Sequence, residues 1–86
     1  MNGINIFDIV KRHIDEMDYY GLLAGGAPAD EFDIESRAIS EKIHIEQSVV
    51  EIAEIIAKVF NAQFNEQDDL AVFLPVAEKI KKDLLG

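Results

Sequence analysis

Ser48-Val-Val-Glu-Ile-Ala-Glu-Ile-Ile-Ala-Lys-Val-Phe60 is the most strongly helical stretch of this 86-residue chain. Its first four residues predict a capping box, in which the Ser48 side chain caps the helix and Glu51 reaches back to the cap. The apolar positions that follow keep the helical period: Ile52, Ile56, Val59 and Phe60, with Val49, Ala53 and Ile55 beside them. A band this wide predicts the central and most buried helix of the fold.

Two weaker helical patterns precede this stretch. Asn5 can cap a first helix, whose apolar positions are Ile6, Val10, Ile14 and Met17. We expect that helix to end near residues 18–20, with Gly21 as its terminator. A second helix is expected to begin with Asp30 or Asp33 as its cap. Its buried face comprises Ile39 and Ile43, with Ser36 or Phe32 one turn earlier.

A last helix follows the polar connector at residues 65–69, and Asp68 or Asp69 can cap it. The helical period of its apolar residues continues across Pro75, which favours one kinked helix. The alternative is a break at Leu74, with Pro75 opening a new helix, because proline is well tolerated in a first turn.

No segment alternates apolar and polar residues with period two, so no strand is expected. The length suits one domain, spanning residues 1–86. The prediction is an all-α protein: a small four-helix bundle with one long loop, rich in Gly and containing Pro, between helices 1 and 2.

Composition excludes several classes of function. The chain has no cysteine, which rules out disulfides and thiol chemistry, and no apolar run near the ~20 residues that cross a bilayer. Its net charge is −9, which opposes binding to nucleic acid or to an anionic membrane and favours a basic partner. The N-terminus lacks the pattern of a secretory signal, so we expect a cytoplasmic protein.

The long loop, Gly21-Leu-Leu-Ala-Gly-Gly-Ala-Pro-Ala-Asp-Glu-Phe-Asp33, is the candidate binding element, because long loops on rigid scaffolds often carry function. Two adjacent tyrosines precede it, and tyrosine is a favoured anchor in protein interfaces. The alternative is that one tyrosine packs and the other covers the core. The candidate binding residues are Tyr19, Tyr20, Asp30, Glu31 and Asp33.

A metal-dependent activity is the rival interpretation. The acidic turn at residues 30–33 could hold a hard cation, and Glu41 and His44 have a spacing that occurs in carboxylate-bridged metal bundles. Such bundles need a second motif of this kind, which the chain lacks. No cofactor motif is present, and neither histidine has a neighbouring Ser or Cys nucleophile. We therefore expect no enzymatic activity.

Residues 15–35 resemble the YugE-like family of small bacterial proteins, a domain of unknown function. The family pattern runs Glu-Trp-Asp-Pro, then Gly-Leu-Leu, then Gly-Ala-Pro-x-Asp-Glu-Tyr-Asp. The matching positions are Asp18, Gly21, Leu22, Leu23, Gly26, Ala27, Pro28, Asp30, Glu31 and Asp33. Met17 stands in the tryptophan place, Tyr19 or Tyr20 in the proline place, and Phe32 in the tyrosine place. The resemblance implies a small helical cytoplasmic protein and implies no activity.

These observations together favour a small, non-enzymatic protein–protein interaction module. The expected partner is a protein, and the excess of acidic residues favours a basic one. The wide apolar band of residues 48–60 also permits self-association, with a second copy completing the band.

Overall fold

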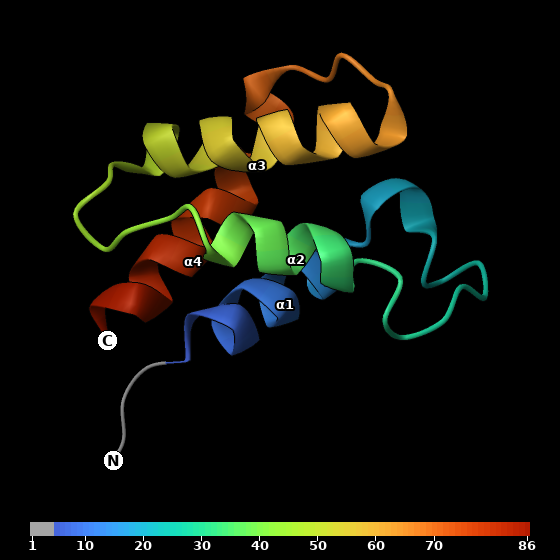
Figure 1. Cartoon of the computed structure of the whole chain (residues 1–86), viewed down its shortest axis with the longest axis horizontal. Helices are drawn as coiled ribbons and strands as arrows, with labels where there is room; N and C mark the ends of the chain where they lie inside the picture. Colours follow the sequence, from blue (N-terminus) through green and yellow to red (C-terminus); the bar gives the residue numbers. More distant parts are fainter. Residues whose placement is uncertain (1–4) are drawn as a thin grey trace.

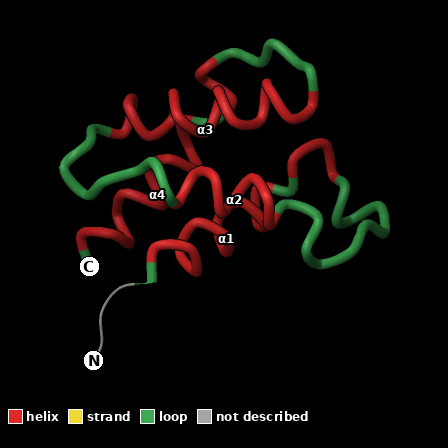
Figure 2. Tube along the Cα trace, in the orientation of Figure 1, coloured by secondary structure: helices red, strands yellow, loops and turns green. Residues whose placement is uncertain are grey.

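The computed structural model describes residues 5–86, and all its regular elements are helices (Figures 1 and 2). In chain order they are α1 (Ile6–Met17), the short 3-10 turn η1 (Tyr19–Gly21), α2 (Asp33–Ser40), α3 (Val49–Phe64), the 3-10 turn η2 (Leu70–Val72) and α4 (Leu74–Leu85). Residues 5–86 contain no strand, so the predicted all-α class is confirmed.

Each of the four α-helices packs against two others. Helix α1 contacts α2 and α4, and α3 on the other side contacts the same two helices, which closes a small four-helix bundle (Figure 1). Helix α3 supplies more buried side chains than any other helix, which agrees with its wide apolar band. No helix within residues 5–86 combines the length and the apolar character needed to cross a bilayer.

Aromatic rings fill the end of the core nearest the long loop. The Phe60 ring lies 4.7 Å from that of Tyr19, 5.7 Å from that of Phe73 and 5.9 Å from that of Phe32, measured between centroids. Phe32, Phe60 and Phe73 are fully buried. Because Phe32 ends the long loop, its burial anchors that loop to the bundle.

Two of the predicted helix starts are confirmed. The Asn5 side chain accepts a hydrogen bond from the Asp8 amide at 3.3 Å, and Ser48 and Glu51 form both halves of the capping box. Gly21 is not the terminator of α1. The helix ends at Met17, because Asp18 takes a left-handed conformation with φ of 49° and donates its amide to Ile14.

The predicted caps of α2 are wrong. Phe32 precedes the helix without a side-chain cap, and Asp33 is already its first residue. Two successive turns lead the chain into α2, through hydrogen bonds from the Glu31 amide to Pro28 and from the Asp33 amide to Asp30, each of 3.0 Å. The buried face of this segment is as predicted, since Phe32, Ser36, Ile39 and Ile43 are all buried.

The apolar stretch around Pro75 is broken, not kinked. It forms η2 and then α4, with Pro75 in the first turn of α4, where its missing N–H costs no hydrogen bond. The break lies at Phe73, whose amide donates to the Leu70 carbonyl at 2.9 Å. Neither Asp68 nor Asp69 caps α4. Asp69 precedes η2 without a capping bond, and Asp68 binds a tyrosine.

Candidate functional site

The candidate site is the acidic loop, defined here as residues 18–33, which carries all five predicted binding residues. Its first half is organised by the Asp18 carboxylate, which accepts hydrogen bonds from the Leu23 amide at 2.6 Å and the Ala24 amide at 3.0 Å. Leu22 and Leu23 pack partly buried against the core. The loop therefore starts from a fixed turn.

Lys11 of α1 fixes the other end of the acidic loop. Its ammonium group donates to Asp33 at 2.6 Å, to the Ala29 carbonyl at 3.3 Å and to Asp15, one turn along α1, at 3.0 Å. The hydrogen bond to Asp33, followed by that to Asp15, raises the pKa of Lys11. Sequence patterns did not point to Lys11, because its partners lie up to 22 residues away.

The two tyrosines have different environments. Tyr19 is 5% exposed, and its hydroxyl donates a hydrogen bond to the Asp68 carboxylate in the connector between α3 and η2. Burial, followed by this hydrogen bond, raises the pKa of Tyr19. Tyr20 is 63% exposed, and its ring rests on that of Tyr19 with 4.4 Å between centroids. Tyr19 is therefore a core residue, and Tyr20 is the ring available at the surface.

Tyr20 also has an unusual backbone. Its φ of 57° and ψ of 17° lie in the left-handed region, between Asp18 (φ of 49°) and Gly21 (φ of 67°). A bulky residue is rare there, because its Cβ approaches the neighbouring carbonyl oxygen. Such strain concentrates at functional sites. The surrounding turn thus presents a large amphipathic ring to solvent at a cost to stability.

The three predicted acidic residues also divide into those available at the surface and one engaged within the fold. Asp30 is exposed and Glu31 half-buried, and neither belongs to the ion pairs formed within residues 5–86. Asp33 is engaged by Lys11. Between Arg12 and Arg37 the sequence has seven acidic residues and no lysine or arginine, so the loop and its flanks are strongly acidic.

The residues of the metal interpretation do not converge. Helix α2 ends at Ser40, so Glu41 and His44 lie beyond it and do not share a helical face. Both are exposed, and the His44 amide is held by the Gln47 side chain at 2.8 Å. Within residues 5–86, no three His, Asp or Glu side chains are placed to share a metal ion.

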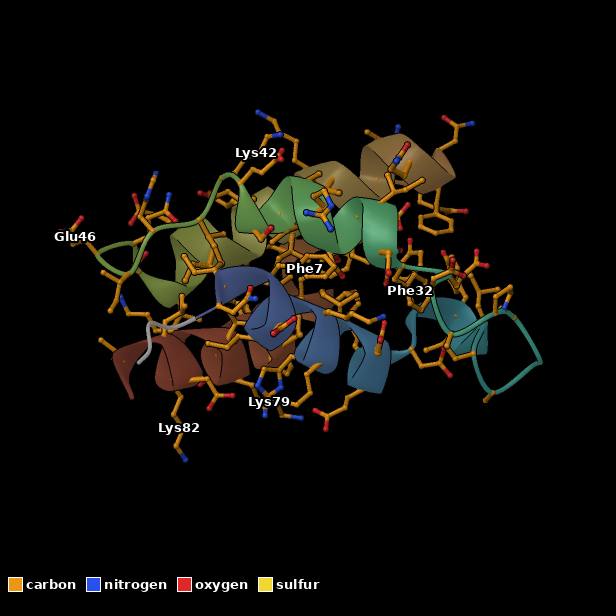
Figure 3. The ribbon with its side chains drawn as sticks, turned by 60° about the horizontal axis from the view of Figure 1, so that its bottom comes forward. Phe7, Phe32, Lys42, Glu46, Lys79 and Lys82 are labelled. Carbon is orange, nitrogen blue, oxygen red and sulfur yellow. The ribbon has the colours of Figure 1, made fainter. Side chains whose placement is uncertain are left out.

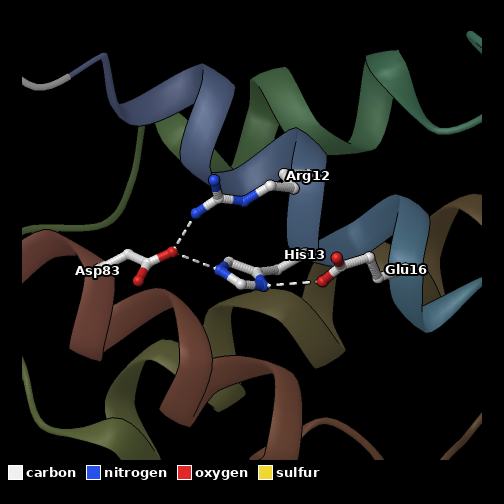
Figure 4. Close-up of polar contacts among 4 residues, drawn as sticks. All are labelled: Arg12, His13, Glu16 and Asp83. Atoms are coloured by element: carbon white, nitrogen blue, oxygen red, sulfur yellow. Dashed lines mark hydrogen bonds and ion pairs between the residues drawn. The ribbon is translucent and has the colours of Figure 1, made fainter.

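A polar cluster that sequence patterns did not predict joins α1 to α4 (Figure 4). The His13 ring, 11% exposed, donates from Nε2 to Asp83 at 2.6 Å and lies with Nδ1 3.2 Å from Glu16. Arg12 also binds Asp83. The hydrogen bond from His13, followed by that from Arg12, lowers the pKa of Asp83.

The geometry of this cluster favours a structural role. Both ring nitrogens of His13 face carboxylates, Glu16 on α1 and Asp83 on α4, so the ring links the two helices. The two carboxylates lie on opposite nitrogens, so they do not converge on one ligand position. Asp83 is 70 residues from His13, which is why no local motif pointed to the pair.

Comparison of the chain with protein-family models, with curated proteins and with solved structures finds no match.

Proposed function

We propose that the chain is a non-enzymatic protein–protein interaction module, which binds a basic partner protein through Tyr20 and the carboxylates of Asp30 and Glu31. The observation that carries the proposal is Tyr20 of the acidic loop, whose backbone is strained and whose side chain is 63% exposed. The left-handed backbone of Tyr20 costs the fold stability, whereas an interface gains a rigid amphipathic anchor.

The fixed ends of the acidic loop support the same proposal. Asp18 and Lys11 hold the two ends of the acidic loop, so its backbone order is established before any partner arrives. A preformed surface loses less conformational entropy on binding than a flexible one. The net charge of −9 would steer a basic protein toward the loop and would oppose a phosphate backbone or an anionic membrane.

Family and location complete the proposal. On the motif of residues 15–35 we propose membership of the YugE-like family of bacterial proteins, and hence a cytoplasmic location.

The experiment compares immobilised variants as baits for proteins from a cell extract. Tyr20→Gly should lose the partner that the unmodified protein retains, whereas Leu85→Ala, which changes a residue that is 65% exposed at the end of α4, should keep it. The pair Asp30→Asn and Glu31→Gln should weaken retention and flatten its salt dependence. The pair Glu54→Gln and Glu78→Gln removes the same charge from exposed sites on α3 and α4 and serves as the control.

Two results would contradict this function. One is retention of the same proteins by Tyr20→Gly and by the unmodified chain. The other is an affinity for the retained protein that does not change as salt is raised, since recognition by the acidic loop requires salt-sensitive attraction.

A further inference from the structure

An open hollow of about 370 Å³ lies against the outer side of α3, away from the acidic loop. Its lining is mostly apolar and comprises Ile55, Val59 and Ala62 of α3 together with Lys42 and Lys58. Val59 is 9% exposed, so it forms the floor, and Ile55 is half-buried. These positions form one edge of the apolar band of α3, and the helices α2 and α4 do not fully cover that edge.

The two lysines give the hollow a definite charge. Lys42 projects from the turn that follows α2 (Figure 3), and Lys58 comes from α3. Neither ammonium group takes part in the ion pairs formed within residues 5–86. In a chain of net charge −9, two lysines that form no ion pair in the described part of the chain, beside one apolar surface, complement an anion.

This charge argues against a second copy of the chain. A symmetric dimer through the hollow would bring each lysine pair close to its own equivalent, because an isologous interface places the same patch on both sides. Like charges facing one another oppose association. Size argues against a large partner as well, since about 370 Å³ falls near the lower end of the range of small-molecule pockets.

The geometry points to a binding site for a small amphipathic anion, with an apolar body the size of a medium-length acyl chain and one carboxylate. The body lies on Ile55, Val59 and Ala62, and the carboxylate accepts hydrogen bonds from Lys42 and Lys58. Glu54 lies one turn before Lys58, beside a neighbouring depression, and would repel an anion placed there. The anion is therefore directed to the hollow that Lys58 and Lys42 both line.

Octanoate is the probe, titrated into the isotope-labelled protein and followed by amide chemical shifts. We expect saturable shifts centred on residues 55–62. Two reference ligands separate the contributions: acetate has the charge without the chain, and 1-octanol has the chain without the charge. Both should bind at least about tenfold more weakly than octanoate, which corresponds to the loss of one interaction of about 1.4 kcal/mol.

Surface variants test the residues without endangering the fold. The pair Lys42→Gln and Lys58→Gln should weaken octanoate binding about tenfold or more. The pair Lys79→Gln and Lys82→Gln removes the same charge from exposed lysines of α4 (Figure 3) and should leave it within about twofold. Ala62→Leu should fill the hollow and compete with the chain of octanoate.

Three results would overturn the site. The first is amide shifts that grow linearly with octanoate concentration without saturating, or that lie outside residues 42–62. The second is equal affinity for octanoate and 1-octanol. The third is an octanoate affinity that does not change in the variant carrying both Lys42→Gln and Lys58→Gln.

Discussion

The Tyr19 hydroxyl donates a hydrogen bond to the Asp68 carboxylate, 49 residues along the chain. This contact ties η1, where the acidic loop begins, to the connector that leads from α3 to η2. It also settles which tyrosine is buried. Because Tyr19 turns inward to reach Asp68, the next residue, Tyr20, turns outward with a left-handed backbone.

Removing the hydroxyl with Tyr19→Phe should destabilise the protein by about 1 to 3 kcal/mol. The loss is larger than for an ordinary hydrogen bond, because the acceptor is a carboxylate that keeps its desolvation without its donor. Urea unfolding measures the change. A double-mutant cycle with Asp68→Asn should give a coupling of about 0.5 kcal/mol or more. Additive effects would show that the two side chains do not interact in solution.

At position 20, replacement by glycine should leave a more stable protein than replacement by alanine. The backbone there has φ of 57°, which glycine adopts without the Cβ clash that alanine keeps. Tyr20→Gly should therefore be more stable than Tyr20→Ala by about 1 kcal/mol, measured by the shift in the urea midpoint. At an exposed helical position the order reverses, so the pair Glu54→Gly and Glu54→Ala is the control. A more stable Tyr20→Ala would mean that the left-handed turn does not persist.

Replacing Ser36 by alanine should stabilise the fold by about 1 kcal/mol. Ser36 is fully buried in α2, and its hydroxyl has no hydrogen-bond partner within residues 5–86. Alanine fits the same space and removes the unpaired polar group. Ser40→Ala is the matched control on the same helix, because the Ser40 hydroxyl does donate, to the Arg37 carbonyl at 2.8 Å. Thermal unfolding compares them, and a lower Tm for Ser36→Ala would show that the Ser36 hydroxyl makes a stabilising hydrogen bond.

Asp83 should make the bundle sensitive to acid. Its folded pKa is lowered by the hydrogen bonds from His13 and Arg12, so it favours folding above the ordinary aspartate value of about 3.9, and this contribution is lost as the pH falls through the folded pKa. Asp83→Asn should be less stable than the unmodified protein near about pH 7. The difference should shrink toward about pH 3.

The control for this pH dependence is Glu54→Gln, which removes an exposed carboxylate outside the ion pairs of residues 5–86. It should follow the pH profile of the unmodified protein closely. Denaturant midpoints at several pH values provide the measurement. An Asp83→Asn profile parallel to that of the unmodified protein would show that the cluster joining α1 and α4 does not couple to stability.

The features that could be predicted from the sequence depend on residues close together in the chain. The capping box of Ser48 and Glu51 and the apolar stripes of the helices depend on residues three or four apart, so they are readable in the sequence. The pairs Tyr19–Asp68 and His13–Asp83 are not, because only the packed bundle brings them together. The prediction that Asp33 caps α2 is wrong for a related reason, since Lys11 of α1 holds the Asp33 carboxylate.

A photo-crosslinking amino acid at position 20 tests the proposed function most directly. In cells that make the protein, crosslinking from position 20 should yield one covalent adduct with a basic protein. Crosslinking carried out in extracts at high salt should not yield it, because salt screens the attraction that brings the partner to the loop. The same amino acid at position 85, where the leucine is 65% exposed at the end of α4, should not yield that adduct. Equal adducts from both positions, or none from position 20, would contradict the assignment of Tyr20 as the anchor.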